Sequence, residues 1–202
     1  MSRDNDLFLA PNRYFDRFFN REAAKILPGE YYVTNQNTMI VTVLGSCVSA
    51  CIRDPRTGIA GMNHFLLPGD PSGSDQLDPS ARYGAYAMEL LVNQLLKLGA
   101  SRHHLEAKVF GGGNVLRGLT LHNVGQRNGE FVTDYLHNEE IPVLASDIGG
   151  DYPRKVYFFP ETGKVKVRRL RSLHNTTILD RESEYRARVK KTPVSGDVDL
   201  FD

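Results

Sequence analysis

The sequence of 202 residues has no tryptophan, only two cysteines, and almost no excess of one charge over the other. Two cysteines cannot build the disulfide framework of a small secreted domain. A formal net charge of +1 gives no electrostatic basis for binding nucleic acid or a membrane surface. No apolar run approaches the roughly 20 residues that span a bilayer, and the polar N-terminus lacks the apolar core of a signal peptide. We therefore expect a cytoplasmic protein with neither nucleic-acid binding nor direct membrane insertion.

The composition that remains is that of a globular domain, with 41% hydrophobic and 24% charged residues. The length suits one domain with a substantial core. Apolar, β-branched runs bounded by turn residues predict strands, and these runs cover residues 38–44, 47–53, 59–67, 105–110, 141–148, 154–159 and 164–170. Amphipathic spacing predicts two main helices, over 80–98 and 124–138. Short turns between strands favour antiparallel pairs, so the pattern indicates a mixed α/β protein with helices on one side of a sheet.

The two ends of the chain differ from this central part. In residues 11–26, aromatic side chains at helical spacing predict an amphipathic helix, which either packs on its own domain or contacts a partner or membrane surface. Residues 177–191 are highly charged and predict a solvated helix, and 192–202 predict a disordered tail. The expected organisation is an N-terminal extension over 1–26, a folded domain over 27–172, and a charged, partly disordered C-terminal extension over 173–202.

The stretch TMIVTVLGSCVSACIRDPRTGIAGMNHFLLP, residues 38–68, carries the candidate chemistry. It reads as three strands joined by two turns, with Cys47 at a sharp Gly-Ser turn and His64 near the end of the third strand. Antiparallel pairing of the second and third strands would bring Cys47 and His64 together. A thiol beside an imidazole is the minimal set for nucleophilic acyl chemistry. Thr42, just upstream, is placed to orient the imidazole.

The Gly-Ser turn gives Cys47 a chemical setting that Cys51 lacks. At Gly45 and Ser46 several backbone N–H groups can point at one spot, which would favour a thiolate and hold an oxyanion. Cys51 lies four residues further on in an apolar strand and reads as a small buried hydrophobe. A metal site made by Cys47, Cys51 and His64 is a further interpretation, but no C-x-x-C pair and no second nearby histidine supports it.

The surroundings of the turn indicate the kind of substrate. Within 38–68 the charged side chains are Arg53, Asp54 and Arg56, at the far end of the strands from the Gly-Ser turn. Because no charge cluster would bind both α-groups of a free amino acid, we expect a side-chain amide delivered by a protein. The glycines at 111–113 follow a strand but match neither G-x-G-x-x-G nor a P-loop. They are better suited to a close backbone approach, and no cofactor is expected.

The motif TVLGSCVSACIRDPRTGIAGMNHFLLP resembles the CheD family, the chemoreceptor glutamine deamidases of bacterial chemotaxis. Three further blocks resemble that family in its order. They are KVFGGGNVL at 108–116, VGQRNGEFV at 124–132 and SDIGGDYPRKVYFFPETGKVKVRRL at 146–170. The resemblance covers roughly residues 25 to 172, and four ordered blocks make it specific.

The resemblance implies a layered α/β/β sandwich of mixed, largely antiparallel sheets. It implies catalytic roles for Cys47, His64 and Thr42, with Gly45 and Ser46 at the oxyanion or substrate. The implied activity is protein-glutamine deamidation, a cysteine-dependent amide hydrolysis that converts receptor glutamines to glutamate through a thioester and releases ammonia.

The resemblance also implies partners, namely the cytoplasmic domain of chemotaxis receptors and a CheC-type phosphatase, with recruitment to receptor arrays. It favours a site-lining role over a solvated helix face for Gln126, Arg127 and Asn128. A non-enzymatic adaptor that binds receptors or the phosphatase is the alternative from another class. A cysteine protease and a transglutaminase share the nucleophile and base.

Overall fold

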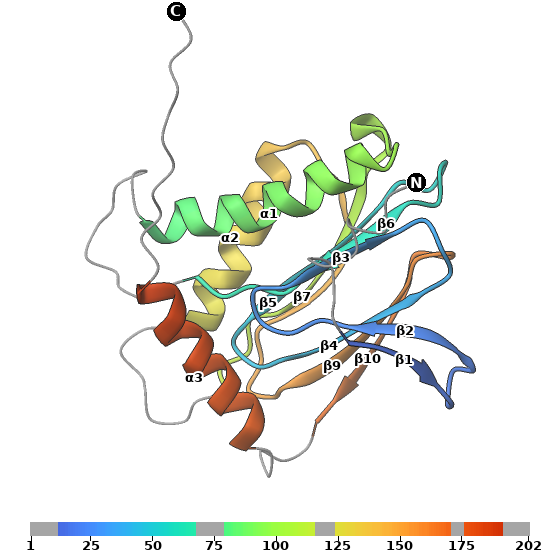
Figure 1. Ribbon diagram of the computed structural model, residues 1–202. Helices are drawn as coiled ribbons and strands as arrows, with labels where there is room; N and C mark the ends of the chain where they lie inside the picture. Colours follow the sequence, from blue (N-terminus) through green and yellow to red (C-terminus); the bar gives the residue numbers. More distant parts are fainter. Residues whose placement is uncertain (1–11, 68–78, 116–123, 171–175, 192–202) are drawn as a thin grey trace, which may run out of the picture.

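The computed structural model describes residues 12–67, 79–115, 124–170 and 176–191, which form two five-stranded sheets and three α-helices (Figure 1). Sheet A contains, in spatial order, β1 (Asn12–Asp16), β2 (Arg21–Lys25), β4 (Met39–Leu44), β9 (Arg154–Phe159) and β10 (Lys164–Arg169). Sheet B contains β3 (Tyr31–Thr34), β6 (Ala60–Asn63), β5 (Val48–Arg53), β7 (Glu106–Gly111) and β8 (Val143–Ile148). The helices are α1 (Pro79–Lys97), α2 (Val124–Asn138) and α3 (Thr176–Lys191), with a short 3-10 turn η2 (Arg102–His104).

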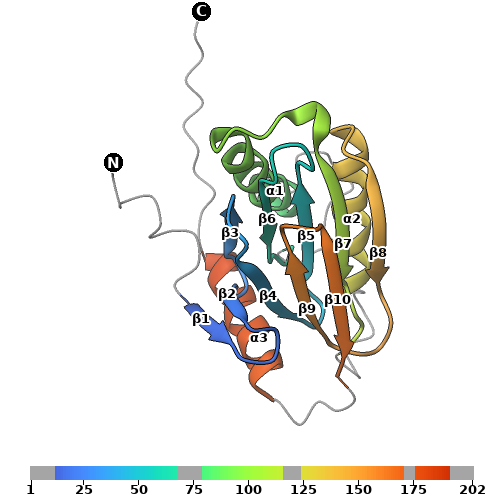
Figure 2. The same cartoon turned by 90° about the vertical axis from the view of Figure 1, so that its right-hand side faces the viewer.

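The elements stack in three layers, with α1 and α2 on the outer face of sheet B and sheet A on its inner face (Figures 1 and 2). Side chains of β5 alternate between the two interfaces. Val48 and Ala50 pack in the cluster that includes the helices, whereas Cys47 and Cys51 pack in the cluster between the sheets. The pairs β2–β4 and β7–β8 are parallel and the other strand pairs are antiparallel. The expected α/β/β sandwich is therefore confirmed.

The helix predicted over 11–26 is wrong, because this segment is a β-hairpin at the edge of sheet A. Strands β1 and β2 pair antiparallel, and β2 runs parallel to β4. The carboxylate of Asp16 accepts hydrogen bonds from the N–H groups of Phe18 and Phe19, at 3.0 and 3.1 Å, and Asn20 has a φ of 50°. These features make a tight turn in the middle of the predicted helix. Aromatic spacing alone could not reveal it.

The β4–β5 turn and α3 meet at one end of the sandwich. Because β4 belongs to sheet A and β5 to sheet B, the turn at 45–47 carries the chain from one sheet to the other. Helix α3 lies across this end (Figure 1). The predicted helix over 177–191 is confirmed, and most of its described side chains are exposed, but one face is not solvated, since Glu182 and Tyr185 are buried. The tail predicted at 192–202 lies outside the described residues.

Candidate active site

The glycine run at the end of β7 holds the β4–β5 turn. Gly112 N–H donates to the carbonyl of Cys47 and Gly113 N–H to the carbonyl of Gly45, both at 2.8 Å. Gly111 has a φ of 113°, and a Cβ there would overlap the carbonyl oxygen of Cys47. A side chain at this position would push the two backbones apart. The predicted close backbone approach of the glycines is therefore present, and the backbone that they approach is that of the Gly-Ser-Cys turn.

Asn128 holds the same turn from the side of α2. Its buried side chain donates from Nδ2 to the carbonyl of Ser46 at 2.8 Å and accepts from Leu67 N–H at Oδ1 at 2.9 Å. Together with the two glycine bonds, this fixes the three carbonyls of the turn. Of the three polar residues expected to line the site, Asn128 bonds to the turn. The amide of Gln126 donates to Glu130 on the exposed side of α2.

His64 and Thr42 meet across the two sheets. His64 follows β6 in sheet B, and Thr42 lies in β4 of sheet A. The Thr42 hydroxyl oxygen is 2.7 Å from Nδ1 of His64 and 2.8 Å from the carbonyl of Ile26. A hydroxyl has one proton, which goes to the carbonyl, so the hydroxyl accepts from Nδ1–H. This network assigns the neutral tautomer whose Nε2 carries a lone pair.

The imidazole of His64 is uncharged at neutral pH. Burial lowers the pKa of His64 to about 4, although the carboxylate of Glu182 and the carbonyl of Ile26 act in the opposite direction. Among the described residues, Nε2 of His64 is buried without a hydrogen-bond partner. A neutral, desolvated imidazole with an available lone pair can act as a general base.

Strand register brings Cys47 and His64 to one face of sheet B. Val48 and Phe65 exchange two backbone hydrogen bonds of 3.0 Å, in the same register that pairs Cys51 with Met62. Val48 and Phe65 point toward the helices, so their neighbours Cys47 and His64 point toward sheet A. The two positions are diagonal cross-strand neighbours, a spacing that side chains of this length can bridge.

Glu182 of α3 is a site residue that the sequence did not predict. Its carboxylate accepts hydrogen bonds from the N–H groups of Gly45 at 2.9 Å, Ser46 at 3.1 Å and Cys47 at 3.3 Å. The Ser46 hydroxyl adds a fourth donor at 2.6 Å. Glu182 is 5% exposed. The turn thus forms an anion site from three consecutive N–H groups and one hydroxyl, the arrangement that stabilises an oxyanion.

Tyr185 anchors α3 beside this site. Its ring is 4% exposed, and its hydroxyl contacts the hydroxyl of Tyr83 on α1. Burial raises the pKa of Tyr83 to about 12, with the nearby Arg188 lowering it and Cys47 adding to the rise. Tyr83 therefore lies within electrostatic reach of Cys47 and stays protonated. The spacing of Glu182, Tyr185 and Val189 on one helical face is the sequence signal that could have indicated a docked helix.

Cys51 has a different environment from Cys47. It lies within β5 between Met62 and Lys108 of the neighbouring strands. Burial raises the pKa of the Cys51 thiol far above its ordinary value, against a small opposing effect of Lys108. Its thiol stays protonated, as expected of a buried hydrophobe. In the part of the chain that the structure describes, no group of three His, Cys, Asp or Glu side chains is arranged to hold a metal ion.

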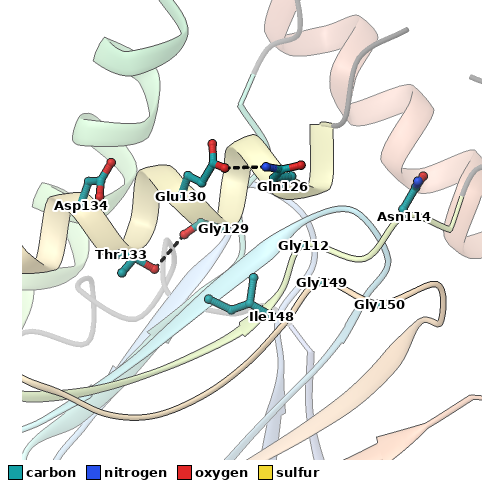
Figure 3. A pocket seen from close by; sticks show the side chains of 10 residues that line it. All are labelled: Gly112, Asn114, Gln126, Gly129, Glu130, Thr133, Asp134, Ile148, Gly149 and Gly150. Atoms are coloured by element: carbon teal, nitrogen blue, oxygen red, sulfur yellow. Dashed lines mark hydrogen bonds between the residues drawn. The ribbon is translucent and has the colours of Figure 1, made fainter. Parts of the chain in front are cut away.

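Two hollows lie near the turn. A cavity of about 20 Å³, lined by residues that include His64, Glu182 and Lys25, has room for one water molecule. A larger hollow of about 510 Å³ lies between α2 and the β8–β9 turn (Figure 3). Its lining includes Gly112, but none of the residues of the 38–68 motif. The second hollow is therefore separated from the thiol by the glycine run.

These elements define a class of site, in which a buried cysteine, a neutral imidazole held by a hydroxyl, and an anion site converge on one turn. Such a set can perform cysteine-dependent acyl transfer. None of the described helices is long and apolar enough to cross a bilayer.

Comparisons with known proteins place the chain in a family. Residues 66–169 match the family described as CheD chemotactic sensory transduction. A protein of Shewanella oneidensis called probable chemoreceptor glutamine deamidase CheD 1 is 66% identical over 192 residues, covering 95% of this chain and 93% of the relative. A protein of the same name from Dechloromonas aromatica is 60% identical over 201 residues, covering 100% of both chains. The probable chemoreceptor glutamine deamidase CheD of Methylobacillus flagellatus is 60% identical over 195 residues, covering 96% of both. The chain belongs to the CheD family, as its motifs indicated.

Proposed function

We propose that this chain is a protein-glutamine deamidase that converts glutamines of chemotaxis receptors to glutamate and releases ammonia. The observation that carries the proposal is the anion site at the β4–β5 turn, where the N–H group of Cys47 is itself one of the donors to a glutamate carboxylate. A glutamine carboxamide entering the same place would have its carbonyl oxygen among those donors. The names of the close relatives supply the receptor as substrate.

The first half of the reaction forms a thioester. Nε2 of His64 takes the proton of the Cys47 thiol as sulfur attacks the side-chain carbonyl carbon of the glutamine. Negative charge develops on the carbonyl oxygen and is stabilised by the N–H groups of the turn. The C–N bond then breaks, and the imidazolium of His64 gives its proton to the departing ammonia. Because burial lowers the pKa of His64 to about 4, this imidazolium is a strong proton donor.

The second half returns the enzyme to its starting state. A water molecule loses a proton to Nε2 of His64 and attacks the thioester carbonyl. The C–S bond breaks, the proton returns to Cys47, and a glutamate side chain leaves. In total, one amide and one water give one carboxylic acid and one ammonia. Thr42 is a positioning residue here, since its bond to Nδ1 holds the ring and leaves the lone pair on Nε2, the nitrogen that takes the thiol proton.

The proposed substrate also suggests where the enzyme works and which partners it meets. A receptor substrate requires the cytoplasm and places the enzyme at receptor arrays. The resemblance to the family adds a CheC-type phosphatase as a second partner. The two half-reactions require no cofactor, because the cysteine, the imidazole and the turn supply all of the chemistry described above.

Incubation with a folded receptor cytoplasmic fragment tests the proposal. Ammonia release and peptide mass spectrometry should show glutamine side chains converted to glutamate, and Cys47→Ala should abolish both signals. Fragment cleavage would indicate a protease, cross-linked products a transglutaminase, and binding without any chemical change an adaptor. Comparable turnover of free glutamine would make the protein a small-molecule amidase and would overturn the receptor assignment.

A further inference from the structure

Helix α3 brings to the site a side chain that is chemically the product of the proposed reaction. Glu182 ends in the carboxylate that deamidation of a glutamine would create, and this group is held by the turn that carries Cys47. It is presented from an α-helix of the same chain.

The site as held by α3 matches a carboxylate better than a carboxamide. One carboxylate oxygen of Glu182 accepts from the N–H groups of Gly45 and Cys47, and the other accepts from the N–H and hydroxyl of Ser46. In a glutamine, one of the two oxygens would be an NH₂ group that cannot accept from Ser46 N–H. The Ser46 hydroxyl can rotate to accept from that NH₂, so a carboxamide still fits, but with one fewer bond. A bound carboxylate is therefore an effective competitor of substrate.

Among the described side chains of α3, those that attach it to the domain lie along one face, as a displaceable element requires. Glu182, Tyr185 and Val189 share one face of the helix and contact the domain. The other described side chains between them and around them are exposed, and these are Asp180, Arg181, Ser183, Glu184, Ala187 and Arg188. Helices with few buried apolar contacts open with small free energies.

We propose that α3 is an intramolecular competitor that occupies the substrate site, with Glu182 in the position of the glutamine side chain, and that a receptor helix and α3 bind there in turn. This inference rests on the proposed deamidase function. A competitor tethered in the same chain lowers the fraction of molecules that can bind substrate. The apparent KM then equals the intrinsic KM divided by that fraction, and kcat is unchanged.

The substitution Glu182→Gln gives a direct test, because it turns the competitor into a substrate. If the introduced glutamine occupies the place of a substrate glutamine, Cys47 should attack its side-chain carbonyl carbon, release ammonia and, after hydrolysis by water, restore glutamate at position 182. Peptide mass spectrometry of the full-length variant should find glutamate at this position although the gene encodes glutamine. The rate should not depend on protein concentration, since enzyme and substrate are one molecule.

Two controls define the result. Glu184→Gln on the exposed side of α3 should retain its glutamine, and the double variant Cys47→Ala with Glu182→Gln should retain the glutamine introduced at position 182. Wild-type protein added to that double variant should convert the introduced glutamine far more slowly than the single variant converts its own. An intact introduced glutamine in a Glu182→Gln protein that deamidates a receptor fragment would overturn this inference and leave the proposed function standing. If neither the introduced glutamine nor a receptor glutamine is converted, the proposed function itself fails.

A kinetic test on the receptor fragment is independent of self-modification. Glu182→Ala should lower KM severalfold at unchanged kcat, while Glu184→Ala should leave both at the wild-type value. Circular dichroism establishes that each variant is folded. A folded Glu182→Ala protein with a raised KM or a reduced kcat would mean that Glu182 supports the site rather than blocks it, and would refute the inference.

Discussion

Replacement of Thr42 by valine removes one hydroxyl from the interface between the two sheets and changes little else. Valine has nearly the shape of threonine, and Thr42 is fully buried in β4. The loss removes the hydroxyl that bridges two buried polar groups, so the carbonyl of Ile26 loses this donor and Nδ1–H of His64 loses this acceptor. An unsatisfied buried group costs about 1–3 kcal/mol. The free energy of unfolding should therefore fall by about 2–4 kcal/mol, measured by urea denaturation.

The same substitution should reduce kcat, through the tautomer of His64. Without an acceptor at Nδ1, the proton can move to Nε2, where it blocks the uptake of the thiol proton. A tautomer preference of about 1–3 kcal/mol corresponds to a loss of roughly 5- to 150-fold in the fraction of competent enzyme. Ammonia release from a receptor fragment measures this loss.

Two matched variants separate positioning from general destabilisation. Thr42→Ser keeps the hydroxyl and should restore most of kcat. Thr34→Val removes a hydroxyl of similar burial, which accepts one hydrogen bond from Gln36 N–H far from the site, and should leave kcat unchanged. A Thr42→Val enzyme with wild-type kcat, or a Thr34→Val enzyme with the same loss, would refute the role assigned to Thr42.

Three further predictions concern the nucleophile, the pH dependence and the support of the turn. Cys47→Ala and Cys47→Ser should abolish ammonia release, whereas Cys51→Ala should retain most of it; the reverse pattern would reassign the nucleophile. Burial lowers the pKa of His64 from 6.5 to about 4, so between these pH values the unfolded chain binds more protons than the folded one. The stability contributed by neutral His64 is thus complete above pH 6.5 and is lost toward pH 4, by about 3 kcal/mol in total. Urea titrations at several pH values should show a steeper fall for wild type than for His64→Gln, and parallel curves would contradict the shift. Asn128→Ala leaves two buried backbone groups unsatisfied and should lower the free energy of unfolding by about 2–4 kcal/mol. Glu130→Ala, at an exposed position, is the control. If Asn128→Ala lowers the free energy of unfolding by less than this control does, the turn is held without Asn128.

Local patterns were sufficient for most of the central fold. The strands predicted over 38–44 and 154–159 match β4 and β9, and the helix predicted over 124–138 matches α2. Each is a continuous periodic run bounded by turn residues, so neighbouring residues determine it. The helix prediction for residues 12–25 is wrong because their aromatic spacing fits a helix, whereas pairing of β2 with β4 determines that the segment forms strands. Such tertiary pairing overrides local preference.

The candidate site divides in the same way. Cys47, His64 and Thr42 lie within 23 consecutive positions. One pairing register brings Cys47 and His64 to the same face of sheet B, and the stacking of sheet A on that face adds Thr42. Glu182 bonds to the turn from more than 130 positions away, through a helix whose composition is that of a solvated surface. One buried carboxylate among many exposed charges leaves no mark in the composition. Its placement depends on how α3 docks, which the strand motif does not determine.

The bond between Thr42 and His64 has a mechanical consequence. Its two ends belong to different sheets, so its length depends on the spacing between the layers of the sandwich. A hydrogen bond weakens steeply as its length and angle depart from their preferred values. Substitutions between the sheets that shift β4 against β6 by a fraction of an ångström will then impair proton transfer while the fold persists. Met62 is buried between the sheets opposite Cys51. A volume-conserving substitution such as Met62→Leu should therefore reduce kcat more than it reduces the free energy of unfolding.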